Sequence, residues 1–170
     1  MKKYLLLVLL ITMLLLMSAC GGEQRSASGH ASGTEDVKTE GSDDDQDEEE
    51  KMLRMYIGDT EVSVDWQENQ SVDALKELCK DEPMVISMSM YGGFEQVGPL
   101  GVALPRSDAQ TRTESGDIVL YSGDQMVVFY GSNSWAYTRL GHITDQSEDS
   151  MRELLGNGNV QITLCMEDKK

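Results

Sequence analysis

Apolar and polar residues alternate along several short stretches of the chain after residue 52. Residues 53–57 and 62–66 alternate on either side of Gly58-Asp59, and this pattern predicts a hairpin. Residues 84–90, "MVISMSM", repeat the alternation, with four apolar side chains opposing a valine and two serines. Period-two alternation places successive side chains on opposite faces of a strand. The pattern therefore predicts strands rather than helices here.

The C-terminal part of the chain continues the strand pattern. Residues 118–121 and 126–130 are predicted strands joined by a turn at Ser122-Gly123-Asp124, and residues 137–143 and 160–166 are two more. The glycine-rich stretch "YGGFEQVGPLG" is expected to form turns, since it holds four glycines in eleven residues. The stretch 104–115 reads as a polar loop.

Two stretches carry helical periodicity instead. Val72, Leu75, Leu78 and Cys79 fall on one helical face, and Ser71 is the expected N-cap. Residues 147–155 form the second helix, which begins at a capping serine and stops at a glycine. The regular turn spacing predicts a mainly β fold, a small closed β-barrel of about eight strands with two short helices.

The N-terminus has a different pattern. Two lysines precede an almost wholly apolar run at residues 5–17, and Ser18-Ala19 stand directly before Cys20. This order is typical of a secretory signal peptide, here residues 1–19. The run is shorter than the roughly 18 residues of a spanning helix. "MSAC" resembles a bacterial lipobox, which implies cleavage before Cys20 and diacylation of its thiol, anchoring the protein on the extracytoplasmic face of the cell membrane.

Residues 20–51 contain no apolar periodicity and end in "SDDDQDEEEK". Such a segment buries too little apolar surface to offset its ordering entropy, so it is expected to be a disordered linker. Its acidic run reads as a solvated spacer that repels an anionic membrane; a weak Ca²⁺ or cell-wall site is the alternative. Residues 52–170 then make one domain of ordinary size.

The charge balance excludes one class of partner. The whole chain carries a formal net charge of −16, and the domain itself is acidic. Binding to a nucleic-acid backbone needs a basic face. We therefore expect no nucleic-acid partner, and no adhesion of the domain face to anionic lipid.

Motifs for catalysis and metal binding are absent. The sequence contains no G-x-S-x-G, H-E-x-x-H or C-x-x-C. The domain has one histidine, His142, which is expected at the surface, and Asp117 and Asp124 are expected to cap turns. We therefore predict no catalytic residue, no metal site and no cofactor. Cys79 and Cys165 are either a disulfide, as the extracytoplasmic setting permits, or two small apolar residues.

The sequence allows two interpretations of one cluster of residues. Residues 129–143 gather aromatic, amide and hydroxyl side chains around one arginine; the candidate ligand-binding residues are Tyr130, Asn133, Ser134, Tyr137 and Arg139, with Trp135 among them. Alternation places Tyr137 and Arg139 on one strand face. The cluster is either a recessed site for a peptide or a small ligand, or the aromatic filling of a barrel end with the arginine bonded to loop carbonyls.

The run "GDIVLYSGDQMVVFYGSNSWAYTRLGHI", with "GNGNV" before the last strand, resembles the bacterial cyclophilin-like fold proteins over nearly all of residues 53–166. The resemblance implies a β-barrel with helices closing its ends. True cyclophilins are peptidyl-prolyl isomerases that use an arginine, a glutamine and a histidine. Residues 83–101 offer Gln96 but no arginine or histidine. The resemblance thus favours a non-catalytic module that binds a peptide, a protein or a small ligand. An isomerase that uses Arg139 is the alternative.

Overall fold

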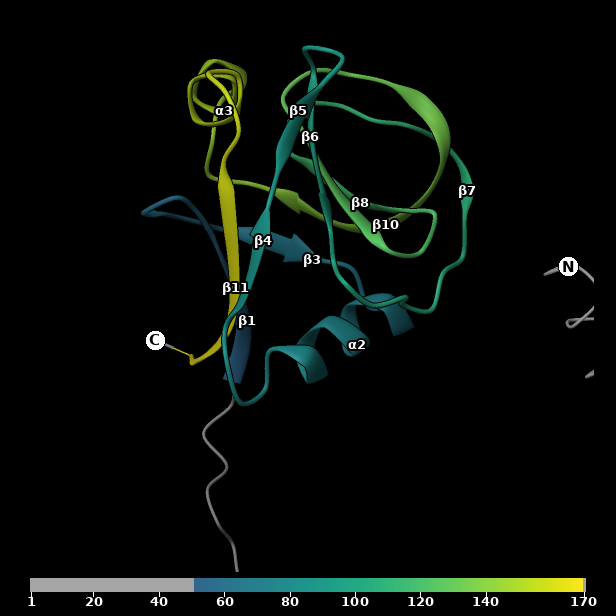
Figure 1. Ribbon diagram of the computed structural model, residues 1–170, viewed down its shortest axis with the longest axis vertical. Helices are drawn as coiled ribbons and strands as arrows, with labels where there is room; N and C mark the ends of the chain where they lie inside the picture. Colours follow the sequence, from purple (N-terminus) through teal and green to yellow (C-terminus); the bar gives the residue numbers. More distant parts are fainter. Residues whose placement is uncertain (1–50, 170) are drawn as a thin grey trace, which may run out of the picture. The chain divides into compact units, whose positions relative to one another are not determined.

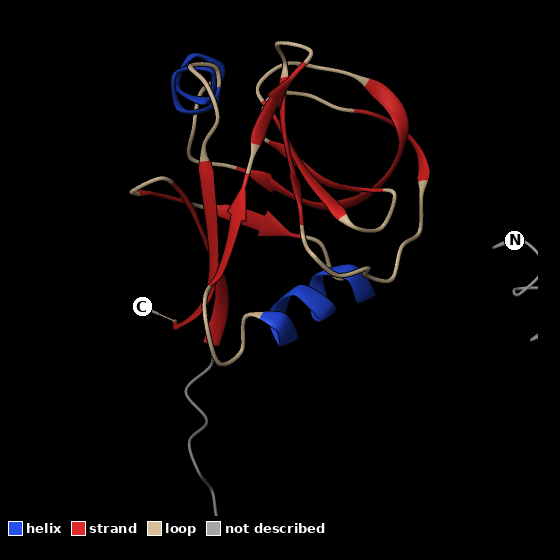
Figure 2. Cartoon of the chain, viewed as in Figure 1, coloured by secondary structure: helices blue, strands red, loops and turns tan. Residues whose placement is uncertain are grey.

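The computed structural model describes residues 51–169, which fold into eleven strands and two helices (Figures 1 and 2). The predicted signal peptide, Cys20 and the acidic linker as far as residue 50 lie outside the described residues. In chain order the elements are β1 (Lys51–Ile57), β2 (Thr60–Val62), β3 (Val64–Trp66), α2 (Gln70–Leu78), β4 (Met84–Ser87), β5 (Ser89–Tyr91), β6 (Glu95–Pro99), β7 (Ala109–Arg112), β8 (Asp117–Tyr121), β9 (Gln125–Phe129), β10 (Ser134–Ile143), α3 (Glu148–Leu155) and β11 (Gln161–Asp168).

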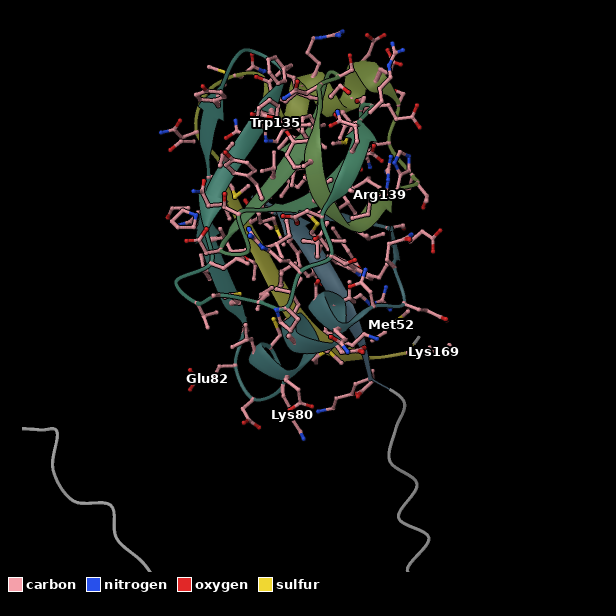
Figure 3. All side chains as sticks on the ribbon, turned by 90° about the vertical axis from the view of Figure 1, so that its right-hand side faces the viewer. Met52, Lys80, Glu82, Trp135, Arg139 and Lys169 are labelled. Atoms are coloured by element: carbon pink, nitrogen blue, oxygen red, sulfur yellow. The ribbon has the colours of Figure 1, made fainter. Side chains whose placement is uncertain are left out.

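The smaller sheet joins the first and the last strands of the domain. Its order is β2-β1-β11-β4, and β1 and β11 pair antiparallel from Lys51 opposite Asp168 to Ile57 opposite Ile162. The predicted Gly58-Asp59 hairpin is confirmed by the pairing of β1 with β2. The two ends of the described chain therefore lie side by side, as Met52 and Lys169 show in Figure 3.

The larger sheet carries the strands that form the candidate site. Its order is β3-β10-β8-β9-β6-β5, and β7 pairs with the beginning of β10. The predicted hairpin of β8 and β9 is confirmed, and its turn holds Ser122 and Gly123 at φ of 54° and 86°. A positive φ at these turn positions matches the right-handed twist of the flanking strands.

The prediction of a closed barrel is wrong, while the mainly β class is confirmed. The stretch 84–90, predicted as one strand, breaks at Met88 into β4, which pairs with β11, and β5, which pairs with β6. A similar break at Ser63 sends β2 and β3 to different sheets. The chain thus crosses between two sheets, and the strand count rises above the predicted eight. Two further strands, β6 and β7, occupy stretches that were expected to be turns and a loop.

Both predicted helices are present, and one cap differs from expectation. Asn69, not Ser71, caps α2, because its Oδ1 accepts from the amides of Ser71 and Val72 at 3.0 Å. The Ser71 hydroxyl instead donates to the carbonyl of Pro105 at 2.6 Å. Ser147 caps α3 as predicted, through its bond from the Ser150 amide.

The main apolar core draws on both sheets and both helices. It includes Met55 and Leu164 from the smaller sheet, and Leu120 and Val128 from the larger one. A second, smaller cluster of buried residues, Val119, Val127, Phe129 and Tyr137, is separate from it. Because neighbouring residues of β8 and β9 divide between the two clusters, both faces of the larger sheet carry buried apolar side chains.

Cys79 and Cys165 are both free thiols in the structure, so the disulfide interpretation is not realised there. Cys79 belongs to the main core, whereas Cys165 points to Glu167, with its Sγ 3.4 Å from Oε1. Burial raises the pKa of both thiols, that of Cys165 to about 11. Within residues 51–169, no helix is long and apolar enough to cross a membrane, and no three metal-binding side chains gather into a site.

Candidate functional site

A pocket of about 350 Å³ opens on the face of the larger sheet that carries the second cluster, and we call it the aromatic pocket. Its lining residues are Tyr91, Glu95, Val97, Tyr121, Gln125, Val127, Asn133, Trp135 and Tyr137. They come from five strands and from the loop before β10. The volume is within the usual range of small-molecule sites.

The register of the sheet explains why these side chains share one face. Directly paired residues of an antiparallel ladder point to the same side. Val97 of β6 is opposite Val127 of β9, which is opposite Val119 of β8. The flanking rows follow the same rule: Tyr91 is paired with Glu95, and Tyr121 with Gln125. Intervening residues of the same strands, such as Val128, belong to the main core.

Aromatic rings form the floor and the rim of the aromatic pocket. Tyr137 lies edge-on to Phe129 and to Tyr121, with centroid separations of 5.8 and 6.1 Å and interplanar angles of 68°. This T-shaped arrangement is the one that aromatic rings favour. Tyr91 and Trp135 are 66% and 58% exposed at the rim. The pocket therefore offers ring surface at several depths.

Glu95 is the unusual polar group of the pocket. It is only 5% exposed, and its Oε2 has no hydrogen-bond partner among the described residues. Burial disfavours the charged carboxylate and raises its pKa from 4.5 to about 7. A buried, unpaired ionisable group costs stability, and such groups gather at functional sites.

The neighbouring phenols respond to Glu95. The pKa of Tyr137 is raised, first by burial and next by the negative charge of Glu95, and the pKa of Tyr130 is raised by the same two causes. Asn133 donates from Nδ2 to the Tyr137 hydroxyl at 3.1 Å. The Asn133 backbone exchanges bonds with Thr113, which holds the loop before β10 in place. The side of the pocket that Asn133 and Tyr137 form is therefore ordered by its own hydrogen bonds.

The structure brings together only part of the predicted cluster. Asn133, Trp135 and Tyr137 line the aromatic pocket. Tyr130 is buried in the main core, and its hydroxyl has no partner among the described residues. Ser134 is exposed and bonds Gln110 at 3.1 Å, outside the pocket lining.

Arg139 is engaged elsewhere. The predicted alternation holds, since Arg139 is opposite Val119, but its guanidinium reaches Asp117, with Nη1 3.0 Å from Oδ1. Nη2 donates to the carbonyl of Arg112 at 3.1 Å. Figure 3 labels Trp135 and Arg139 at separate places on the domain surface. Arg139 thus bonds a backbone carbonyl at the end of β7 and a buried carboxylate, and it does not line the aromatic pocket.

Asp117 does more than cap a turn. Its Oδ2 accepts from the Glu114 amide at 3.0 Å, as a turn-capping role requires. Its Oδ1 also contacts Arg139 and, at 2.9 Å, Nδ1 of His142. The Asp117 side chain is only 3% exposed, and both of its carboxylate oxygens have partners. His142 is partly exposed near the end of β10, close to its predicted place.

A second pocket, of about 530 Å³, lies where the start of α2 meets the loop before β7 and β10. Its lining includes Arg106 and Arg139, and both have carboxylate partners, Asp108 at 3.5 Å and Asp117. Asn69 uses its amide nitrogen on the Arg139 carbonyl at 2.9 Å. Both arginines and Asn69 therefore have partners, in contrast to Glu95.

Gln96, the residue compared with cyclophilins, faces the opposite side of β6 from Glu95. It is fully buried, and its Nε2 donates to the carbonyls of Leu155 and Gly158 at 2.6 Å. It therefore ties the end of α3 to the sheet. Gln96 and Arg139 do not meet in one site.

Sequence reasoning missed Glu95, together with Tyr91 and Tyr121 of the rim. The four glycines of residues 91–101 favoured turns over a strand. A weaker signal was present, since Glu95 and Val97 alternate with Gln96 and Gly98 in the manner of a strand. That alternation would have placed Glu95 beside an apolar row.

Comparison with known proteins supports the fold family. The model of the cyclophilin-like family matches residues 55–165. Neither the curated proteins nor the solved structures contain a match to this chain. The matched residues span β1 to β11, and so include both sheets and every residue that lines the aromatic pocket. The chain belongs to the cyclophilin-like family.

Proposed function

We propose that this domain is a binding module whose ligand enters the aromatic pocket. The observation that carries the proposal is the buried carboxyl of Glu95, which lines the pocket with an oxygen that no described residue satisfies. A ligand that donates to this oxygen recovers the hydrogen bond that folding leaves unmade. Rigid rings around one unsatisfied polar group match the usual composition of ligand sites.

Binding fits this face better than catalysis does. The lining residues are tyrosine, tryptophan, valine, amide side chains and one carboxyl group. Nucleophilic catalysis needs a nucleophile within reach of a base, and prolyl isomerisation needs a donor aimed at the twisted amide. Recognition needs only shape and one polar contact, and the pocket provides both.

The test is a thermal-shift screen of the full-length protein against peptides and small metabolites. Val97→Trp places a large ring on the pocket floor, and Val85→Trp is the matched control on exposed β4 of the other sheet. We expect ligands that stabilise the wild type to lose their effect with Val97→Trp and to keep it with Val85→Trp. Ligands that stabilise both variants equally would place binding outside the pocket.

We further propose that the protein is held at the extracytoplasmic face of the membrane by lipid on Cys20. The residues "MSAC" after the apolar run support this. In Figure 3, Trp135 at the pocket rim lies in the upper part of the domain, and Met52, near the start of the described chain, lies in the lower part. Cys20→Ala should abolish labelling of the protein by a fatty-acid analogue. Labelling that persists in this variant would contradict lipid anchoring at Cys20.

A further inference from the structure

We propose that the aromatic pocket selects an organic ammonium group, with Glu95 as its counter-ion and the surrounding rings as its walls. The inference rests on the proposed binding function and names the chemical class of the ligand. The ammonium group belongs either to a small free amine or to a side chain of a peptide or protein, since both present the same chemistry to the pocket.

The rings supply the first argument. Tyr91, Tyr121, Trp135 and Tyr137 line one pocket, so ring surface is offered from four positions on three strands. Ring faces carry negative electrostatic potential and attract ammonium groups, most strongly where water is excluded. Tyr91 and Trp135 are more than half exposed. Large aromatic surface is usually buried, so its exposure around a pocket favours a role in contacting a ligand.

Glu95 supplies the second argument. Its carboxyl is buried beneath the rim, and Oε2 has no partner among the described residues. Among residues 51–169, no lysine, arginine or histidine lines the pocket. A cation is the partner that a buried carboxylate lacks, and in a poorly solvated site their attraction is strong.

The net charge of the chain also favours a positively charged ligand. The chain carries a formal net charge of −16, so an anion approaches against repulsion and a cation is attracted. A protonated Glu95 would instead donate to a carbonyl or carboxylate, which is the competing ligand chemistry. The rings and the net charge both favour the cation.

The binding reaction then carries a proton signature. With its pKa near 7, Glu95 is largely protonated at pH 6 and must lose this proton when the cation binds. The titratable groups that face it are Tyr91 of β5, Tyr121 of β8, Tyr130 and Tyr137. The pKa values of the last two are raised above 10.0, so their phenols stay neutral. Affinity should rise about tenfold between pH 6 and pH 8, and a proton should be released on binding at pH 6.

The experiment compares charged ligands with neutral isosteres by calorimetric titration of the full-length protein in non-ionic detergent. Choline is paired with 3,3-dimethylbutan-1-ol, which has the same shape without charge. Nα-acetyl-lysine methylamide is paired with its norleucine counterpart. The variants are Glu95→Gln, which keeps the shape of the side chain, and Glu77→Gln, at an exposed position of α2, as the control.

We expect at least one amine to bind about tenfold or more tightly than its isostere, and the preference to disappear in Glu95→Gln but not in Glu77→Gln. Tighter binding of choline points to a free amine, and tighter binding of the lysine derivative points to a side chain. Equal binding of amine and isostere, or an unchanged preference in Glu95→Gln, overturns the ammonium inference.

The two proposals fail in distinguishable ways. If a neutral isostere binds as well as its amine and loses binding with Val97→Trp, the pocket is still a binding site. Its selectivity for an ammonium group is then refuted. Absence of amine binding even at tens of millimolar also overturns the ammonium inference. The binding function itself falls only if no stabilising ligand of the wider screen is sensitive to Val97→Trp.

Discussion

Replacing Glu95 by glutamine should make the protein more stable at alkaline pH. The substitution keeps the shape of the side chain and removes a charge that the pocket solvates poorly. Glu95 is 5% exposed, and burial raises its pKa from 4.5 to about 7. The change therefore isolates the cost of holding one unpaired carboxylate in this site.

The sign and size follow from proton linkage. Below pH 4.5 the carboxyl is protonated in both states, and its ionisation costs folding nothing. Between pH 4.5 and about 7 the unfolded chain ionises first, so the wild type loses stability as pH rises. At about 1.4 kcal/mol per pKa unit, the full loss is about 3 kcal/mol by pH 8. Glu95→Gln avoids this loss, so its advantage should grow from near zero at pH 4.5 to about 3 kcal/mol at pH 8.

Urea denaturation of full-length wild type and variant, followed by tryptophan fluorescence at pH 5, 6, 7 and 8, measures the difference. Glu77→Gln, on the exposed side of α2, is the control and should show no growing advantage. A difference between wild type and Glu95→Gln that stays constant across this range would refute the reasoning. So would an advantage that shrinks as pH rises, because the carboxylate would then be stabilised by the folded protein.

Three further predictions concern the surroundings of the pocket. Asp117→Asn removes the carboxylate that Arg139 contacts at 3.0 Å, and urea denaturation should show a loss of about 1–3 kcal/mol, against little change for the exposed Asp124→Asn; equal effects of the two would contradict the structural role of Asp117. Gly98→Ala places a methyl group against the side chains of Met88 and Ile86 and 3.0 Å from the backbone oxygen of Ser87, so overpacking should cost about 1–3 kcal/mol in the same assay. An unchanged stability would contradict this overpacking. In a cis/trans assay on a proline tetrapeptide, wild type and Arg139→Ala should both stay at the uncatalysed rate, because Arg139 is already engaged by Asp117; acceleration by the wild type that is lost in the variant would restore the isomerase hypothesis.

Local patterns were sufficient for most elements of the fold. The alternation around Ser122-Gly123-Asp124 predicted the β8–β9 hairpin, and both helices were recognised from their periodicity. The capping serine of α3 was also found. The cap of α2 was misplaced by two residues, because Asn69 and Ser71 are both good capping residues and only the backbone bonds distinguish them.

The candidate site was predicted in part. Asn133 and Tyr137 were singled out and do line the pocket, whereas Arg139 shares a strand face with Tyr137 but bonds Asp117. Alternation states which face a side chain occupies. It does not state which neighbour the end of a long side chain will reach.

The sequence by itself determined the mainly β class of the fold and most strand positions, because these depend on periodicities and turn residues within a few positions of one another. The family was indicated by the resemblance of one long run of residues to the cyclophilin-like proteins. Tertiary structure alone decided that the strands form two sheets rather than a barrel, since breaks at Ser63 and Met88 send the chain from one sheet to the other. The tertiary structure also decided that Glu95 is buried and that its pKa is raised. That carboxyl is buried beside Tyr137 only because β6 and β10, far apart in the sequence, contribute to one pocket, and burial by distant residues is not written in any local pattern.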